Sequence, residues 1–166
     1  MKKILLFLIV CCAFQSVALA KEPIEVSIAI KKRGDIIRPI GNTLIVGRIF
    51  PTIVVIVENV SNSSQKLYSD DRIGRLGTIA FEVKDRSKRR NVIKRKVSIS
   101  KSSMKSFKHM KPGASEMFEV VLDERKWENA FKLYDKGSRT FKARAIFYNG
   151  TKKIYSPYYD VIVEDY

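Results

Sequence analysis

Cysteine is nearly absent from this 166-residue chain, and both copies, Cys11 and Cys12, lie within the first twenty positions. The rest of the chain can form no disulfide and offers no thiolate as a nucleophile or metal ligand. Histidine is equally scarce, because His109 is the only one. Lysines surround it in the sequence and would repel a metal cation. We expect neither thiol chemistry nor a zinc centre, and we interpret His109 as a solvated loop residue.

The motifs of common enzyme classes are also missing. No serine lies in a Gly-x-Ser-x-Gly elbow, and no glycine-rich phosphate loop is present. The loop around Asp70 and Asp71 has oxygen ligands for Ca²⁺, but without ligand spacing a plain turn is the preferred interpretation. A Ser-His-Asp set assembled from distant residues stays open. We predict a protein that is not an enzyme and that uses no cofactor and no metal.

The first twenty residues have the three parts of an export signal. Two lysines follow Met1, an apolar stretch runs from Ile4 to Phe14, and Ala18 and Ala20 suit the small-residue pocket of a signal peptidase. The apolar stretch is too short to cross a membrane, which takes about 20 residues. We predict a signal peptide at residues 1–20, a single domain at residues 21–166, and a secreted or periplasmic mature protein.

A lipid anchor on Cys11 or Cys12 is the alternative to simple cleavage. Lipoprotein signals favour a small residue before the modified cysteine, and the residue before Cys11 is Val10. Cleavage after Ala20 is therefore the preferred interpretation.

Alternation of apolar and polar residues predicts strands along most of the mature chain. The run Thr52–Val57 is continuously apolar after its threonine and predicts a central, buried strand. Asn149-Gly150 predicts a type I′ hairpin turn, and Pro157 places the last strand at an edge or at a bulge. The predicted strands are residues 24–31, 52–57, 78–84, 92–100, 118–122, 141–147, 152–155 and 159–163.

Only one segment favours a helix, residues 123–133, where Asp123 suits the N-cap and Trp127, Ala130 and Phe131 share one face. Short strands with regular turn signals and almost no helix predict an all-β fold, a two-sheet antiparallel sandwich with one short helix.

One further pattern spans residues 51–163, and its parts are VEN, IAFEVKD, KPGASEMFEVVL, Trp127 and DKGSRTFKARAIFY. These segments resemble bacterial exported immunoglobulin-like domains, and the pattern is similar to the intracellular-proteinase-inhibitor type. The resemblance implies an immunoglobulin-like sandwich that acts by recognition. Phe141 departs from the pattern, because a corner tyrosine would bond its hydroxyl to the backbone.

Positive charge is concentrated in one block. Without Lys2 and Lys3 the chain has 30 basic and 17 acidic residues, a net charge of +13, and residues 84–111 carry +11 of it with Asp85 as their only acid. Such self-repulsion destabilises a fold, so a partner of opposite charge is a natural explanation, and a solubilising surface is the alternative. The predicted anion-binding residues are Lys88, Arg89, Arg90, Lys94, Arg95 and Lys96.

These observations predict an exported recognition module that binds an acidic polymer or protein at the cell envelope. One alternative is a protease-inhibitor-like domain that acts through a protruding loop, with Ser61–Asp71 and Ser100–Pro112 as candidates. Another is a structural subunit that pairs through its exposed last strand, since Tyr159–Val163 is largely apolar.

Overall fold

A computed structural model describes residues 22–47, 52–69, 79–84, 90–95, 106–123, 125–129 and 140–164, and its regular elements in these ranges are all strands. The predicted all-β class is therefore confirmed, whereas the predicted signal peptide lies outside the described residues. The strands are β1 (Ile24–Lys32), β2 (Asp35–Ile37), β3 (Thr43–Gly47), β4 (Thr52–Asn59), β5 (Gln65–Ser69), β6 (Ile79–Lys84), β7 (Arg90–Arg95), β8 (Ser106–Met110), β9 (Ser115–Val121), β10 (Trp127–Glu128), β11 (Thr140–Asn149), β12 (Lys152–Tyr155) and β13 (Tyr159–Glu164).

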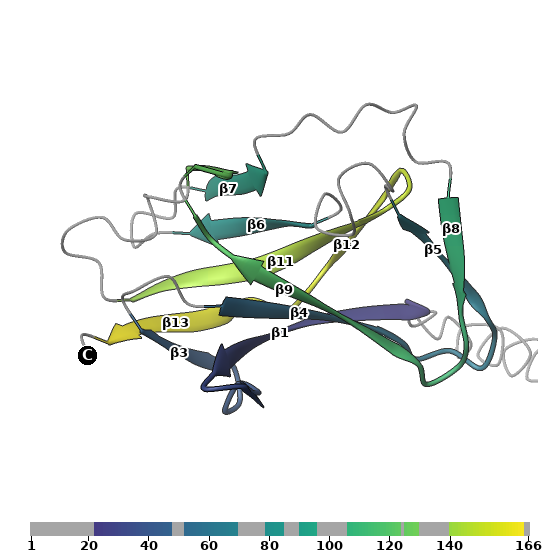
Figure 1. Ribbon diagram of the computed structural model, residues 1–166, viewed down its shortest axis with the longest axis horizontal. Helices are drawn as coiled ribbons and strands as arrows, with labels where there is room; N and C mark the ends of the chain where they lie inside the picture. The colour runs from purple at the N-terminus through teal and green to yellow at the C-terminus, as the bar shows by residue number, and fades with distance from the viewer. Residues whose placement is uncertain are drawn as a thin grey trace, which may run out of the picture.

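Two larger sheets share one hydrophobic core (Figure 1). The four-stranded sheet has the order β2-β1-β4-β9, and the other has the order β10-β7-β6-β11-β13-β3, with β12 also paired to β11. Inward side chains from both sheets, such as Val55 and Phe118 from the first and Phe81 and Phe147 from the second, meet in this core. The continuous apolar run of β4 is explained by its central position, and Val54 to Val57 are all buried.

The seven-stranded sheet is not wholly antiparallel, because β3 pairs in parallel with β13. Val161 lies opposite Leu44, and both side chains are buried. The last strand was predicted at an edge or at a bulge, and the edge is wrong: β13 lies between β11 and β3. Its apolar residues are explained by this internal position.

The predicted bulge at Pro157 is present. β12 pairs with β11 up to Ile146↔Tyr155, and β13 resumes at Ala143↔Tyr159, so three residues oppose two. Ser156 bridges the interruption, since its Oγ accepts a hydrogen bond from the Ala145 N–H at 2.9 Å and its own N–H donates to the Ala145 carbonyl at 3.0 Å. A proline is tolerated here because no ladder bond needs its N–H.

The hairpin between β11 and β12 is confirmed, but its loop lies one residue later than predicted. Asn149 pairs with Lys152, so Gly150 and Thr151 form the two-residue loop. Only Gly150 has a positive φ, 64°, which fits a type II′ turn and not the predicted type I′ turn. Asn149 instead uses its side chain, which accepts a bond from the Tyr68 N–H at 2.9 Å and donates to the Lys66 carbonyl at 2.9 Å.

A third sheet, β5 paired with β8, stands at one end of the molecule at a steep angle to the other strands (Figure 1). The buried side chain of Asn59 stabilises the corner between β4 and β5. Its Nδ2 donates to the carbonyls of Ser63 at 2.8 Å and Met110 at 2.9 Å, and its Oδ1 accepts from Ser61. The two segments proposed as protruding loops therefore contain paired strands.

The predicted helix at residues 123–133 is not confirmed. Residues 125–126 form a turn and Trp127–Glu128 form β10, which pairs with β7, while residues 130–133 lie outside the described residues. The Trp127 ring is buried, with its centroid 5.9 Å from that of Phe81. Trp127 of the predicted helical face is thus buried at a sheet edge, while Ala130 and Phe131 lie outside the described residues.

Candidate ligand-binding face

The structure describes half of the predicted anion-binding residues. Arg90 and Lys94 lie on β7, and the backbone of Arg95 pairs with Trp127. Lys88, Arg89 and Lys96 lie outside the described residues. The side chains of Arg90 and Lys94 are 68% and 63% exposed.

Both exposed cations project from the outer face of the seven-stranded sheet. Ile93, between them in the sequence, is fully buried in the core, and alternation along a strand places residues 90, 92 and 94 on the opposite face. The register sets Arg90 opposite Lys84 and Lys94 opposite Ala80 of β6. The charged face therefore continues from β7 onto the neighbouring strand.

Glu82 lies at the centre of this face. Arg144 of β11 donates to its Oε2 from Nε at 3.0 Å and from Nη2 at 2.6 Å, and the Tyr158 hydroxyl donates to Oε1 at 2.7 Å. The Nε of Arg90 lies 3.6 Å from the same Oε1. These neighbours cover Glu82, so only 6% of it is exposed although it lies on the outer face of the sheet.

The pKa of Glu82 reflects this environment. Burial raises the pKa of the carboxyl, but the hydrogen bonds from Tyr158 and Arg144 and the charges of Arg144 and Arg90 outweigh burial and lower it below its ordinary value. Glu82 therefore stays ionised and holds the guanidinium and the phenol in place.

Cations and tyrosine rings alternate beside Glu82. The Arg144 guanidinium carbon lies 4.1 Å from the Tyr155 ring centroid and 4.6 Å from that of Tyr158, and the Lys84 Nζ lies 3.9 Å from the Tyr158 centroid. All three distances are within the range of cation–π attraction. We call these residues the cation–aromatic face: Glu82, Lys84, Arg90, Arg144, Tyr155 and Tyr158.

Glu82 and Arg144, at the centre of this face, were not among the site residues predicted from the sequence. Strand alternation placed Glu82 and Arg144 on outward positions, but it does not specify that β6 and β11 are neighbours with these residues opposite each other. Tyr155 and Tyr158 belong to the face, whereas Tyr159 is buried and Tyr68 contacts Phe107 on the third sheet.

Acidic residues distant in sequence offset part of the positive charge. Lys94 pairs with Glu128 of β10 at 3.4 Å, and Lys142 pairs with Asp160 of β13 at 3.3 Å. The first pair offsets one lysine of the basic block at residues 84–111, whereas Lys142 lies outside that block. These two pairs are exposed, so they compete weakly with an incoming ligand.

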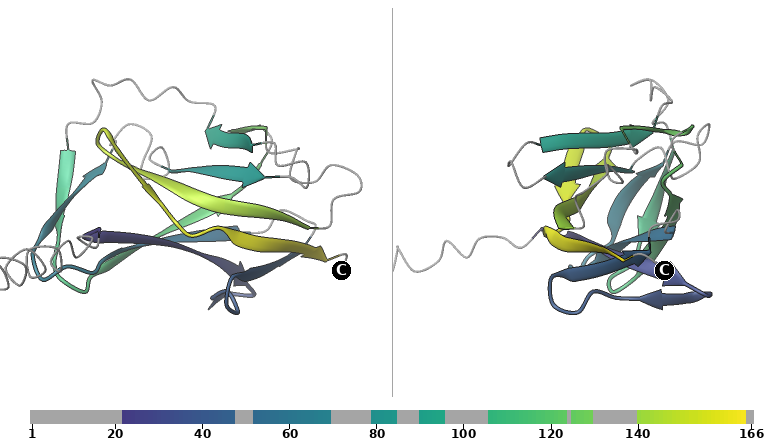
Figure 2. Two further views of the ribbon diagram at one scale, coloured as in Figure 1. Left: turned by 180° about the vertical axis from the view of Figure 1, so that it is seen from behind. Right: turned by 90° about the vertical axis from the view of Figure 1, so that its left-hand side faces the viewer.

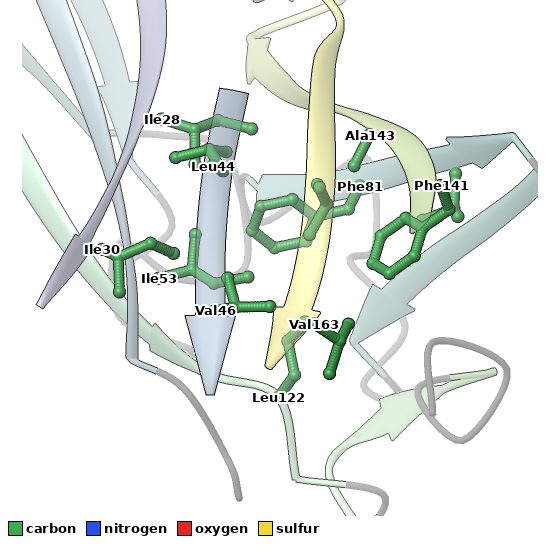
Figure 3. Close-up of a pocket in the computed structure, with 12 residues that line it drawn as sticks. Ile28, Ile30, Leu44, Val46, Ile53, Phe81, Leu122, Phe141, Ala143 and Val163 are labelled. Carbon is green, nitrogen blue, oxygen red and sulfur yellow. The ribbon is translucent and has the colours of Figure 1, made fainter. Parts of the chain in front are cut away.

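The cavity between the two larger sheets is lined by no polar side chain that could bind or react with a ligand. It measures about 40 Å³, and all twelve lining residues are apolar, among them Ile28, Leu44, Phe81 and Phe141 (Figure 3). Phe141, which replaces the corner tyrosine of the resemblance, therefore contributes hydrocarbon to the core.

Within the described ranges, no group of three or more His, Cys, Asp or Glu side chains is arranged to hold a metal ion. His109 is exposed on β8, where its ring packs edge-on against Phe107 at 5.4 Å. It was predicted in a loop, and it lies in a strand instead. Among the same residues, no helix is long and apolar enough to cross a membrane.

No protein-family model matches this sequence, and no curated protein matches it.

Proposed function

We propose that this protein is an exported, non-enzymatic recognition module that binds an acidic partner at the cell envelope. Binding uses the cation–aromatic face together with the predicted anion-binding residues of the adjoining basic hairpin, which are Lys88, Arg89, Arg90, Lys94, Arg95 and Lys96. The observation that carries the proposal is the series Lys84–Tyr158–Arg144–Tyr155, ordered around one buried carboxylate. Arginine held against aromatic rings is preorganised, so less side-chain entropy is lost when an anion binds. The export component rests on the signal pattern of residues 1–20.

An immunoglobulin-like topology is part of the proposal. The neighbours β1-β4-β9 match strands A, B and E of one immunoglobulin sheet, and β13-β11-β6-β7 match strands G, F, C and C′ of the other. The third sheet, β5-β8, is an addition to that plan. Domains of this architecture often present ligand sites on exposed surfaces, and that part of the inference is by analogy.

The test is retention on immobilised dextran sulfate across a salt gradient. The variant Lys84/Arg90/Lys94→Ala removes three cations from one face, and the control Lys32/Lys66/Lys111→Ala removes three exposed lysines elsewhere. Each released counterion steepens the salt dependence, so the first variant should elute at clearly lower salt than the control. Equal shifts would mean diffuse charge and would overturn the proposal.

A second variant tests the aromatic component without a change of charge. Tyr155→Ala removes a 43%-exposed ring that lies over Arg144. It should lower the elution salt of the protein, because Arg144 loses the support that orients it. Unchanged retention would restrict the site to the lysines and Arg90.

Protease inhibition through a protruding element remains the alternative. Phe107, 48% exposed on β8, is the most prominent apolar side chain of the third sheet. Inhibition of a protease would survive Lys84/Arg90/Lys94→Ala and would be lost on Phe107→Ala. The structural-subunit alternative loses its premise, because β3 covers the edge of β13.

A further inference from the structure

Only three of the nine residues of β1 are paired on its outer edge. β4 pairs with β1 from Ile24 to Lys31, but on the other side β2 pairs only with residues Ile30 to Lys32. Among the described residues, no strand pairs with the edge formed by Ile24–Ala29. An uncovered strand edge is a template for another strand.

The geometry of the β1–β2 hairpin identifies the backbone groups at this edge. Its loop is Arg33-Gly34, with φ of 53° and 97°, as in a type I′ turn, so Lys32 and Asp35 form its hydrogen-bonded closing pair. Hydrogen-bonded pairs recur at every second residue. The N–H and C=O groups of Ile24 and Val26 therefore point to the uncovered edge.

Tyr159 supports this assignment from the opposite wall. Burial raises the pKa of Tyr159, whereas a hydrogen bond from the Ile28 backbone lowers it, which identifies the Ile28 N–H as the donor. Ile28 is the next even-numbered residue along β1, so its N–H faces the same edge as those of Ile24 and Val26. The Tyr159 hydroxyl therefore lies on the side of β1 toward which these N–H groups point.

A groove of about 550 Å³ runs beside this edge. Each of its two walls is formed by a strand that lies at the edge of its sheet over this stretch. One wall is the uncovered part of β1, and the other is β12 with the bulge that contains Pro157. β12 pairs only with β11 among the described residues. Figure 2 (left) shows β1 in purple and the β12–β13 segment in yellow passing close to each other.

The charges of the groove decide between possible occupants. Glu22, Glu25 and Glu58 line it together with Arg38 and Lys153, and Glu22 is paired with Lys152 at an exposed position. Glu25 lies directly opposite Glu58 on β4, so two carboxylates are brought together beside the edge. A second copy that paired through the same edge would bring its own carboxylates toward these, and like charges across neighbouring strands are unfavourable. A basic peptide gains attraction at the same positions.

We propose that this groove binds an extended peptide with basic side chains, which adds as a strand to the uncovered edge of β1. Main-chain hydrogen bonds to Ile24 and Val26 supply affinity, and alternate side chains of the peptide meet the carboxylates of Glu58 and of Glu22, where a basic side chain replaces Lys152. The groove shares Tyr155 with the cation–aromatic face, but its carboxylates attract the opposite charge. The protein would then join a basic segment to an acidic partner.

The probe is a fluorescein-labelled, acetylated heptapeptide of alternating valine and lysine, titrated into the purified protein by fluorescence anisotropy. A second peptide with the same sequence carries backbone N-methyl groups at alternate residues, so it keeps the charge but cannot pair as a strand. We expect saturable binding of the first peptide and at least tenfold weaker binding of the second. Equal binding of the two peptides would overturn the proposal.

Variants separate the groove from the rest of the surface. Glu22→Gln and Glu58→Gln should each weaken peptide binding by roughly two- to fivefold, as expected for exposed ion pairs. The matched control Glu128→Gln and the variant Lys84/Arg90/Lys94→Ala should leave it unchanged. This last variant distinguishes the two proposals, because it impairs only the cation–aromatic face.

Amide hydrogen exchange measured by NMR locates the peptide. The Ile24 and Val26 amides should exchange rapidly in the free protein and become protected when the unmethylated peptide is bound. Protection that instead grows with protein concentration in the absence of peptide would identify a second copy as the occupant and overturn the proposal. Binding without protection of these amides would also overturn it.

Discussion

Arg144 donates two hydrogen bonds to a single oxygen of Glu82, from Nε at 3.0 Å and from Nη2 at 2.6 Å, although the two residues lie 62 positions apart in the sequence. The contact joins β6 to β11 on the outer face of the seven-stranded sheet. It therefore couples the stability of the fold to the arrangement of the proposed binding face, and this coupling has a measurable pH dependence.

Glu82→Gln should change the stability of the protein near neutral pH and not in strong acid. The folded-state pKa of Glu82 is lowered, so its contribution is present above the unfolded-state pKa and is lost as the pH falls through the folded-state pKa. We expect the free energy of unfolding to fall by about 1–3 kcal/mol at pH 7, with the difference closing as the carboxyl is protonated. Urea unfolding followed by Trp127 fluorescence measures it.

Glu128→Gln is the matched control for that measurement. Its carboxylate pairs with Lys94 at 3.4 Å, but the side chain is 42% exposed, so the pair contributes little. We expect a change within about 0.5 kcal/mol at every pH. Parallel pH curves for the two variants would show that Glu82 has no special role.

Asn59→Ala should destabilise the corner between β4 and β5. The substitution removes the Nδ2 donor from the carbonyls of Ser63 and Met110, which keep only the Ser61 and Ser64 hydroxyls, and it removes the Oδ1 acceptor of the Ser61 hydroxyl. Because Asn59 is fully buried, we expect a loss of about 2–4 kcal/mol in the free energy of unfolding. Asn62→Ala, an exposed residue of the same turn, should change it by less than about 0.5 kcal/mol, and similar losses for both would contradict the assigned role.

Strand identity in this protein was largely predictable, because a strand with one buried face must alternate. Ile24–Lys32 and Thr140–Asn149 follow that rule closely. The third sheet was not predictable, since its sequences QKLYS and SFKHM are polar and bury few side chains, among them Leu67 and Met110. Such strands depend on distant partners, here each other, and leave almost no local signal.

The candidate face was predictable in charge but not in geometry. Composition located the positive block, and within it Arg90 and Lys94 lie on the outward face of β7. The position of Glu82 beneath Arg144 and Tyr158 depends on the order of strands β6, β11 and β13, and no local pattern encodes that order. The parallel pairing of β3 with β13 escaped prediction for the same reason.

Gly150→Ala should lower the free energy of unfolding more than Gly41→Ala, although the two glycines have nearly equal φ, 64° and 60°. Both substitutions place a Cβ in the left-handed region of backbone conformation, which lowers the free energy of unfolding by about 1–2 kcal/mol. A Cβ on Gly150 would in addition lie 3.3 Å from Cδ2 of Tyr68, whereas one on Gly41 meets nothing within 4 Å.

We expect Gly150→Ala to be less stable than Gly41→Ala by up to about 1 kcal/mol, because the Tyr68 ring must shift. Faster hydrogen exchange of the Tyr68 amide, which donates to Asn149, should accompany the loss. Equal losses of stability in the two variants would contradict this prediction and would mean that the Tyr68 ring moves aside without a cost in free energy.

Export is tested by the mass of the mature protein. Cleavage after Ala20 would give a chain that begins at Lys21, because small side chains at Ala18 and Ala20 suit the peptidase pocket. Intact-mass measurement of protein recovered outside the cytoplasm should find this chain, and Ala20→Phe should block its formation while Leu19→Phe, at the tolerant position between the two alanines, should not. A mature chain that begins at Cys11 or Cys12 with added lipid mass would contradict this prediction and anchor the domain to a membrane surface. Lys21 at the N-terminus would instead leave β1 preceded by three residues only, so that the groove beside Ile24 and Val26 is open to a partner.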